Sequence, residues 1–446
     1  MARTAIVEGF RSPFCKEGTS LRDVPPEFLG ALMISEMVQR MKNLGIDPAL
    51  VDFVVGSNVA TPAHAPNIAR ISAVKGGLSP SIPADTISKN CGSGIAAVNY
   101  GDMLIKASRT RRAKIVVVVG VELMSQIPML YQEIIKKDFF ALSRPQPWTA
   151  KTKLILSLYS KLLRFWKKEY SPKVGLLLGL TDPICELIMG LTAENLAKDP
   201  SLGITREDQD KFALRSHQKA LKAEKLFAEE IHPLYIPSGN KYSYVDSDNG
   251  IRKEASLDLF AKAKPFFDRR YGTVTAANSS QITDGAASIL LMDEHIAKGF
   301  GLPVLGYIVD HCDVGFDPTL MGLAPVGAIA KLLNQTKRNL KEISVLEINE
   351  AFAAQVLACT RVISSNTLMN KFFSSYNLGN APGEVREDQL NPNGGAIALG
   401  HPVGVSGMRL IITALKELGR RDTNQALVST CIGGGQANAM LLERGR

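Results

Sequence analysis

One cysteine, Cys91, stands where a loop passes into a helix, in the stretch SKNCGSGIAAV (residues 88–98). The first N–H groups of a helix have no partner within it, and the positive end of its dipole stabilises a thiolate over a thiol. This position therefore predicts a nucleophile that ionises near neutral pH. The alternative is a small buried residue packed under the turn, a common place for a free cysteine.

His401 is the one of six histidines that lies in a glycine-dense turn, GGAIALGHPVGVSG (394–407), where another helix is expected to begin. Glycines allow the backbone to approach a ligand closely, and an imidazole there could accept a proton from a nucleophile. A histidine that merely caps the turn is the alternative.

Two further stretches place polar residues at strand ends. In STCIGGGQANA (429–439), Cys431 precedes three glycines whose amides could converge on an oxyanion, although a phosphate cradle or a plain turn fits equally well. In EINEAFAAQ (347–355), Asn349 stands between a strand and a helix. It is either an N-cap or an amide that orients a water molecule.

The elements that must position these residues follow an α/β pattern. Apolar runs typical of buried strands alternate with helical periodicity: AIVEGF, VDFVVG, KIVVVVG, VLGYIVD, VLEINE and ALVSTCIGG. Residues 91–120 and 401–433 share one plan, in which a Gly/Ser turn opens a helix that leads to a strand. We therefore predict two similar α/β halves, with mixed sheets and helices between them, whose glycine-rich loops face one site.

The expected boundaries follow from this pattern. The N-terminal half covers 1–120 and is completed by about 276–300, and the C-terminal half covers 301–446. Residues 121–275 are less regular and more polar, which predicts an inserted loop domain that faces the substrate. It includes a basic insertion at about 136–185.

Composition narrows the class of protein. The 446 residues are 45% hydrophobic and 21% charged, enough for a full core, and the six cysteines show no disulfide or metal-site spacing. No apolar run is long enough to span a membrane, and MARTAIVEGF lacks the features of a secretory signal. We expect a cytoplasmic protein. The net charge of +9 comes without a nucleic-acid-binding signature, so no nucleic-acid partner is expected.

Together, NCGSG, NEAFA, NGGAIALGHPVGVSG and CIGGG occur in the order found in the thiolases, acetyl-CoA acyltransferases that cleave or form 3-ketoacyl-CoA. The sequence resembles this family over almost its whole length, which implies a duplicated thiolase-like fold. The stretch HAPNIAR and the basic insertion are most similar to the β subunit of the fatty-acid oxidation trifunctional complex.

The resemblance implies a role for each candidate. Cys91 would attack the thioester carbonyl and carry the acyl group. His401 would activate Cys91 and hold the enolate oxygen together with a water positioned by Asn349. Cys431 would move the proton at the α-carbon, and the acyl oxyanion would rest on the amides of Cys91 and Gly433.

The resemblance also implies substrate contacts and partners. Arg252 would lie near the adenine pocket of coenzyme A with Phe267 beside it, and Ser280 at the pantetheine arm, although Arg252 could be a solvated charge and Ser280 a turn residue. No metal and no cofactor are expected, because coenzyme A is a substrate along with acyl-CoA. A homodimer or tetramer is expected, with a hydratase/dehydrogenase α subunit as a possible partner.

The basic insertion contains AKTKLILSLYSKLLRFWKK (150–168), which predicts an amphipathic helix. Its apolar residues are expected near one face, with basic residues around it: Leu154, Leu158, Leu162, Phe165 and Trp166, then Lys151, Lys161, Arg164 and Lys168. This pattern favours peripheral contact through residues 136–173 with the inner membrane face, or with a partner subunit, over packing within the loop domain. The following VGLLLGLTDPICELIMG (174–190) is expected to line an acyl tunnel.

The resulting hypothesis is a 3-ketoacyl-CoA thiolase of fatty acid β-oxidation for medium or long chains. A biosynthetic acetoacetyl-CoA thiolase and a non-catalytic lipid-binding or scaffold subunit are the alternatives. A ketoacyl-carrier-protein synthase is disfavoured, because it uses one cysteine with two histidines, whereas this sequence offers Cys431 and Asn349.

Overall fold

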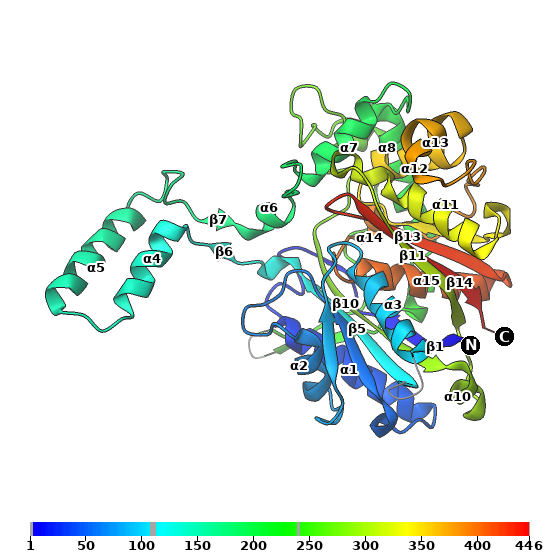
Figure 1. The fold of residues 1–446 in the computed structure, drawn as a ribbon, viewed down its shortest axis with the longest axis horizontal. Helices are drawn as coiled ribbons and strands as arrows, with labels where there is room; N and C mark the ends of the chain where they lie inside the picture. The colour runs from blue at the N-terminus through cyan, green and yellow to red at the C-terminus, as the bar shows by residue number, and fades with distance from the viewer. Residues whose placement is uncertain (1–2, 108–112, 239–240, 446) are drawn as a thin grey trace.

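The structure, a computed structural model, describes residues 3–107, 113–238 and 241–445. Within these residues, ten strands form one sheet (Figure 1). The strands run in the order β12-β13-β14-β11-β1-β10-β5-β3-β4, and the short β2 pairs with β10. Their bounds are β1 (Thr4–Arg11), β2 (Cys15–Lys16), β3 (Phe53–Ser57), β4 (Ala84–Ile87), β5 (Ile115–Leu123), β10 (Thr283–Asp293), β11 (Gly306–Gly315), β12 (Val345–Ile348), β13 (Gln425–Ile432) and β14 (Gln436–Arg444).

The sheet repeats one pairing pattern twice. β1, β10, β5 and β3 are joined by two antiparallel pairings and one parallel pairing, and so are β11, β14, β13 and β12. The two half-sheets meet where β1 pairs with β11. The predicted duplicated α/β fold is therefore confirmed. The connection at 108–112, inside the repeat noticed in the sequence, lies outside the described residues.

Helices cover both faces of this sheet. Those in the two halves are α1 (Pro26–Asn43), α2 (Ile68–Lys75), α3 (Ser93–Lys106), α10 (Glu294–Gly299), α11 (Ala324–Thr336), α12 (Ala353–Ile363), α13 (Asn366–Phe373), α14 (Ala396–Leu399) and α15 (Ser406–Arg421). In β5, Val116 and Val118 pack in a core with α3 and α15, whereas Val117 and Val119 pack in a core with α1. Because both faces of β5 are buried, its sequence is a continuous apolar run.

The backbones of α3 and α15 are in direct contact at the first turns of the two helices. A Cβ atom at Gly94 would lie 2.8 Å from the Met408 amide nitrogen, and one at Gly407 would lie 2.6 Å from the Ile95 amide nitrogen. Only glycine permits such an approach. This crossing brings together the loops that precede the two helices, which carry Cys91 and His401.

The middle of the chain adds helices that pack on the C-terminal half and a projecting arm. Its elements are β6 (Met129–Leu130), α4 (Glu133–Leu142), α5 (Trp148–Leu162), β7 (Lys173–Val174), α6 (Gly175–Gly179), α7 (Met189–Lys198), α8 (Arg206–Lys222), β8 (Leu234–Ser238), β9 (Lys241–Val245) and α9 (Leu257–Ala261). α7 and α8 contact α12, and α8 also contacts α14.

The helical arm, residues 129–174, consists of the antiparallel α4 and α5 on a stalk made by β6 and β7, and it stands clear of the body (Figure 1). Ile135 and Leu158 are buried in this hairpin. Asp138 accepts hydrogen bonds from Lys161 at 2.7 Å and Ser157 at 3.1 Å. The hairpin is therefore tied by an apolar contact and an ion pair.

The single apolar face expected for residues 150–168 is wrong in two respects. Leu158 is buried in the hairpin, whereas Ile155 and Tyr159 on the same helix are exposed. α5 also ends at Leu162, so Phe165 and Trp166 lie beyond the helix, 61% and 69% exposed. The helix has two apolar surfaces because one of them is needed to hold α4.

The close contact between α3 and α15 predicts that one methyl group added at Gly94 strongly lowers the stability of the protein. Gly94→Ala is expected to lower the free energy of unfolding by about 2–3 kcal/mol, because overpacking against backbone cannot be relieved by a rotamer change. Thermal unfolding measures the effect.

The matched control is Gly419→Ala in α15, where a Cβ atom meets nothing within 4 Å. It is expected to be neutral or stabilising by about 0.5–1 kcal/mol. Equal stability of the Gly94→Ala variant and the parent protein would contradict the backbone contact.

Candidate active site

A tight turn presents Cys91 immediately before α3. Asn90 adopts a left-handed conformation with φ of 46°, which asparagine tolerates better than most residues. The Ser93 hydroxyl donates to the Asn90 carbonyl at 2.7 Å and accepts from the Lys89 amide at 2.7 Å. The turn is therefore fixed on both sides of the cysteine.

The environment of Cys91 favours the neutral thiol. Burial raises its pKa to about 11, and the charge of Glu122 adds to the rise. Hydrogen bonds from the backbone amides of Gly433 and of Cys91 itself act in the opposite direction. The expectation of a thiolate near neutral pH is therefore wrong, because burial outweighs the amides at the helix start. Cys91 needs a base.

The loop after β13 lies directly against the Cys91 turn. The Asn90 side-chain amide donates to the Gly433 carbonyl at 3.2 Å, and the Asn438 amide donates to the Gly92 carbonyl at 2.9 Å. A Cβ atom at Gly92 would lie 2.3 Å from the Ile432 side chain. The two amides predicted to hold an oxyanion, those of Cys91 and Gly433, thus point at one sulfur.

Cys431 is the penultimate residue of β13 and is buried. Burial raises the pKa of its thiol well above the usual value, and the charges of Cys91 and Cys359 add to the effect. Gly433, two residues further along the chain, lines the cavity with Cys91, and its carbonyl accepts from Asn90, so Cys431 lies near the turn that carries the nucleophile.

His401 has one ring nitrogen held and the other available. Its Nδ1 atom lies 2.6 Å from the Ser406 hydroxyl, which donates its only hydrogen to the Pro402 carbonyl at 3.0 Å. With the hydroxyl donating to Pro402, the matching tautomer carries its proton on Nδ1 and has a lone pair on Nε2. Nε2 is buried and has no hydrogen-bond partner within the described part of the chain.

Burial, with a smaller contribution from the positive charge of Arg409, lowers the pKa of His401 to about 4. The imidazole is thus neutral at physiological pH and able to accept a proton. Val403, two residues along the same loop, lines a cavity with Cys91.

Asn349 follows β12 and does not cap a helix, because α12 begins only at Ala353. Its backbone amide donates to the Ser429 carbonyl at 3.0 Å. Both polar atoms of its buried side chain lack a partner among the described residues. Buried amides are usually satisfied, so this side chain fits the alternative of holding a water molecule.

A cavity of about 280 Å³ opens at Cys91. Its wall is mainly apolar, formed by Val59, Ala60, Thr61, Asn90, Cys91, Met124, Ile127, Pro128, Leu130, Gly175, Leu176, Leu178, Gly179, Leu180, Met189, Val403 and Gly433. The α6 segment expected to line an acyl tunnel thus lies beside the nucleophile. The base of the helical arm forms part of the same wall.

The residues expected to contact coenzyme A do not line this cavity. The Arg252 amide donates to His217, and its guanidinium lies 5.7 Å from the Phe260 ring centre. Phe267 packs edge-on against Phe352 in the cluster around Cys431.

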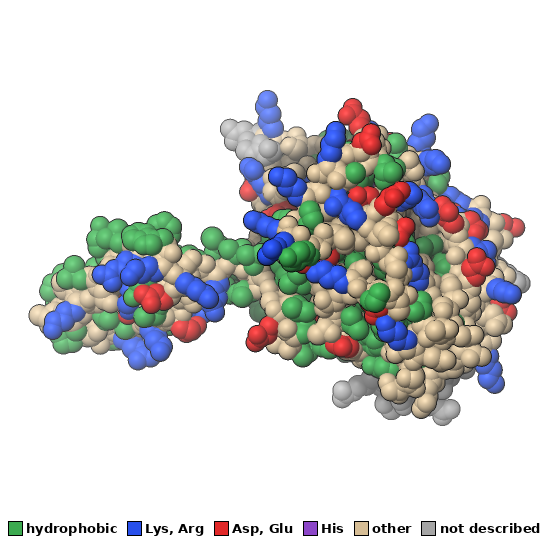
Figure 2. Space-filling model, turned by 90° about the horizontal axis from the view of Figure 1, so that it is seen from above, with side chains coloured by type: hydrophobic (Ala, Val, Ile, Leu, Met, Phe, Trp, Pro, Cys, Tyr) green, Lys and Arg blue, Asp and Glu red, His purple; other side chains and the backbone are tan. Residues whose placement is uncertain are grey.

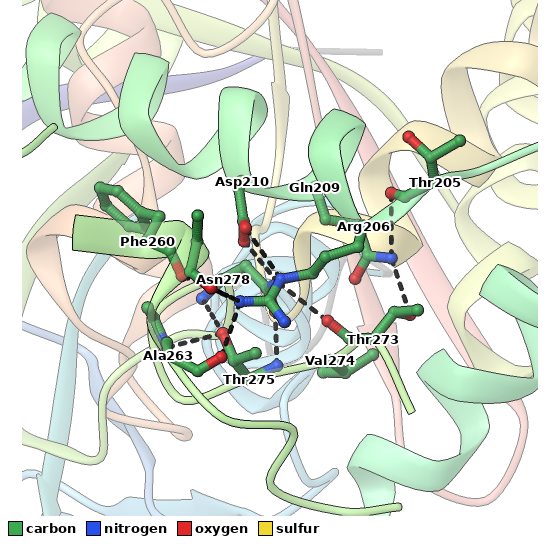
Figure 3. Close-up of polar contacts among 12 residues, drawn as sticks. Thr205, Arg206, Gln209, Asp210, Phe260, Ala263, Thr273, Val274, Thr275 and Asn278 are labelled. Atoms are coloured by element: carbon green, nitrogen blue, oxygen red, sulfur yellow. Dashed lines mark hydrogen bonds and ion pairs between the residues drawn. The ribbon is translucent and has the colours of Figure 1, made fainter. Parts of the chain in front are cut away.

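Ser280 donates its backbone amide to the Ala351 carbonyl at 2.9 Å, beside Asn349 in sequence. The segment before it is tied to α8 by the contacts in Figure 3. Arg206 pairs with Asp210 at 2.8 Å, and Asp210 accepts from Asn278 at 3.0 Å. Arg206 also donates to the carbonyls of Phe260 and Ala263. These contacts hold the segment that carries Phe267 and Ser280 in place.

Two positioning residues were missed in the sequence. Ser406 holds His401 and stands five residues after it, within the motif already singled out. Asp182 accepts from the Gly434 amide at 2.6 Å, which ties the segment after α6 to the loop of Gly433. No local pattern marks Asp182, because its partner lies 252 residues away.

Comparison with known proteins places the chain in a family. The description "Thiolase, N-terminal domain" matches residues 4–295, and "Thiolase, C-terminal domain" matches residues 302–444. The chain belongs to the thiolase family. It is thus an acyltransferase, in a family that acts on acyl-CoA and CoA, and the resemblance seen in the sequence is confirmed.

Individual thiolase relatives match along the whole chain. A protein of Staphylococcus aureus (strain COL) named "Probable acetyl-CoA acyltransferase" is 36% identical over 449 residues, which cover 100% of both chains. The crystal structure of the Bacillus anthracis acetyl-CoA acetyltransferase has a TM-score of 0.82 at 32% identity and covers 100% of this chain and 99% of its own. That of human mitochondrial 3-ketoacyl-CoA thiolase has a TM-score of 0.82 at 30% identity and covers 99% of each chain.

Residues 3–107, 113–238 and 241–445 contain no group of three or more His, Cys, Asp or Glu side chains arranged to hold a metal ion. No helix in those ranges is long and apolar enough to cross a membrane.

The hydrogen bond to His401 predicts the effect of one hydroxyl. Ser406→Ala is expected to lower kcat for acyl transfer about tenfold or more, because the Nδ1 proton loses its acceptor and the tautomer with a free Nε2 is no longer favoured. Steady-state kinetics measure this loss.

Ser288→Ala is the matched control, since its buried hydroxyl donates to the Val118 carbonyl within the sheet. Its kcat is expected to match that of the parent enzyme. A Ser406→Ala enzyme with unchanged kcat would rule out this orientation of the imidazole.

Proposed function

We propose that this thiolase cleaves 3-ketoacyl-CoA with CoA to give acetyl-CoA and a shortened acyl-CoA, with medium or long chains as substrates, in fatty acid β-oxidation. The observation that carries this proposal is the apolar cavity at Cys91, whose wall includes Leu176, Leu178 and Leu180. Apolar surface of this kind stabilises bound methylene groups by about 0.8 kcal/mol each. A substrate with a four-carbon acyl group would leave much of this apolar cavity empty.

The proposed reaction uses each residue at a stated atom. The Cys91 sulfur, deprotonated by Nε2 of His401, attacks the 3-keto carbon, and the amides of Cys91 and Gly433 stabilise the oxyanion. The bond between C2 and C3 then breaks, and its electron pair forms the enolate of acetyl-CoA. Cys431 protonates C2, while His401 and a water on Asn349 hold the enolate oxygen.

The second half-reaction releases the shortened chain. The thiol of free CoA attacks the acyl–Cys91 thioester after it gives up its proton to a base in the site. The resulting tetrahedral intermediate rests on the same two amides, and its collapse returns the Cys91 thiolate and yields acyl-CoA. Coenzyme A is thus a substrate, and the chemistry requires no metal or resident cofactor.

The chain-length proposal predicts the effect of filling the cavity. Leu176→Trp is expected to lower kcat/KM for long 3-ketoacyl-CoA substrates at least about tenfold and to spare acetoacetyl-CoA, because overfilling an apolar site costs about 1–3 kcal/mol. The measurement is thiolysis rate against acyl length.

Leu177→Trp is the matched control, because Leu177 is its neighbour on α6 but faces solvent outside the cavity. The Cys91→Ala variant gives the background rate of the assay. Activity in the parent enzyme on acetoacetyl-CoA alone would favour the biosynthetic thiolase, the activity named for the Bacillus anthracis relative. Absence of turnover at every length would favour the scaffold alternative.

We further propose that the helical arm contacts an anionic lipid surface. Ten Lys or Arg residues stand against two acidic residues between positions 136 and 173. Large apolar side chains are exposed among them, including Phe140, Trp148 and Trp166, and Figure 2 shows apolar and basic side chains gathered on the arm. Burial of such side chains and attraction to anionic headgroups act together.

Vesicle binding tests the arm. Replacing both Trp148 and Trp166 with Ala is expected to reduce sedimentation with phosphatidylglycerol-containing vesicles about tenfold or more, because two interfacial side chains are lost. Tyr271→Ala is the control, an equally exposed aromatic on the body. Parent protein that fails to bind these vesicles would contradict the lipid proposal and favour a protein partner.

Three expectations from the sequence remain predictions. These are a homodimer or tetramer, a hydratase/dehydrogenase α subunit as partner, and a cytoplasmic location with peripheral contact at the inner membrane face. The arm and the open edge of β4, which pairs only with β3 in the described sheet, are surfaces that such assemblies could use.

A further inference from the structure

Glu122 is a fully buried carboxylate that the reaction steps above do not use. It stands near the end of β5 and accepts hydrogen bonds from the Gly404 amide at 2.7 Å, the Ala60 amide at 2.8 Å and the Val59 amide at 3.1 Å. The Asn58 side-chain amide approaches it at 3.3 Å. All four partners are N–H donors, so the side chain acts only as an acceptor, as an ionised carboxylate does.

The four donors come from two loops that both border the active site. Val59, Ala60 and Thr61 form one part of the cavity wall, and Val403 forms another. Gly404 lies between His401 and Ser406, which holds the imidazole. A single carboxylate therefore joins one wall of the cavity to the loop that carries the base.

Gly404 shows how close this contact is. A Cβ atom there would lie 2.7 Å from the nearer Glu122 oxygen and 3.2 Å from Cα of Asn58. The carboxylate occupies the space that a side chain would need. The loop from 401 to 406 can reach its observed place only with glycine at 404 and an acceptor at 122.

The charge of Glu122 also acts on the nucleophile, because it raises the pKa of Cys91. Burial raises the pKa of Glu122 itself to about 7, whereas the amides of Ala60, Gly404 and Val59 lower it. Asp284 of β10 and Cys91 are the ionisable groups that interact with it electrostatically. Glu122 thus contributes hydrogen bonds to two loops and negative charge near the sulfur.

We propose that Glu122 is a positioning residue, whose carboxylate holds the His401 loop against the 58–61 wall and places a negative charge behind the cavity that opens at Cys91. The proposal rests on the acyl-transfer roles proposed for Cys91 and His401. It predicts opposite effects on two rates when the charge is removed. Turnover falls because the loop is released, and the reactivity of Cys91 toward a small alkylating agent rises.

Glu122→Gln tests this with two measurements. The glutamine side chain presents its own N–H groups to the backbone N–H donors that now bind Glu122, so the His401 loop is expected to shift. Because small misplacements of catalytic groups lower the rate strongly, kcat is expected to fall about tenfold or more. Alkylation of Cys91 by iodoacetamide, followed at pH 8 by mass spectrometry of its peptide, is expected to accelerate at least about threefold, because a negative charge that raises the pKa of the thiol is removed. Alkylation needs no turnover, so it tests the charge effect even if the proposed substrate is wrong.

Glu122→Asp keeps the charge and shortens the side chain by one methylene group. It is expected to keep the alkylation rate of the parent enzyme and to retain more kcat than Glu122→Gln, and it serves if the glutamine variant does not fold. Glu294→Gln, which removes a largely buried carboxylate that pairs with Arg3 and Lys298 and does not line the cavity, is the control and should leave both rates unchanged. Parent-like kcat in Glu122→Gln, or a parallel fall of kcat and alkylation, would overturn the proposal.

Discussion

The active site depends on one contact, the backbone crossing of α3 and α15 at Gly94 and Gly407. Each helix begins just after a loop, so a crossing at the first turns brings those loops together. One loop carries Cys91 and the other carries His401 and Val403. β13, a strand of the sheet, packs against α15, and the chain at its end adds Cys431 and Gly433. Two halves of a duplicated fold thus contribute separate parts of one site, and neither half contains all of them.

Burial sets the resting state of this site. It raises the pKa of Cys91 and lowers that of His401, so both groups favour their neutral forms in the absence of substrate. A neutral thiol beside a neutral imidazole is stable and unreactive, and proton transfer between them is most useful once a carbonyl stands ready for attack. The amides of Cys91 and Gly433 then stabilise the charge that moves to the substrate oxygen.

Much of the fold follows from local sequence. The strands β1, β3, β5, β12 and β13 correspond to apolar runs because both of their faces are covered. The glycine-rich loops are recognisable because close backbone contacts exclude other residues. The roles of β10 and β14 as central strands of the two half-sheets depend on pairing with distant segments, which no local pattern reveals.

The errors made from the sequence share a cause. At Cys91 the helix start was visible in the sequence, but the larger burial effect arises from residues brought in by the fold. In α5 the periodicity was visible, but which apolar residues turn inward depends on α4. The links from Asp182 to Gly434 and from Glu122 to Gly404 join segments more than 250 residues apart. Such contacts are defined by three-dimensional packing alone.

The meeting of the two halves at one sulfur is tested most directly by a crystal structure of the enzyme trapped with an acyl group after reaction with substrate. The account predicts a thioester on Cys91 whose carbonyl oxygen accepts hydrogen bonds from the amides of Cys91 and Gly433, with Cys431 and His401 facing the vacated acetyl site. An acyl group on another residue, or a carbonyl oxygen turned away from both amides, would contradict it.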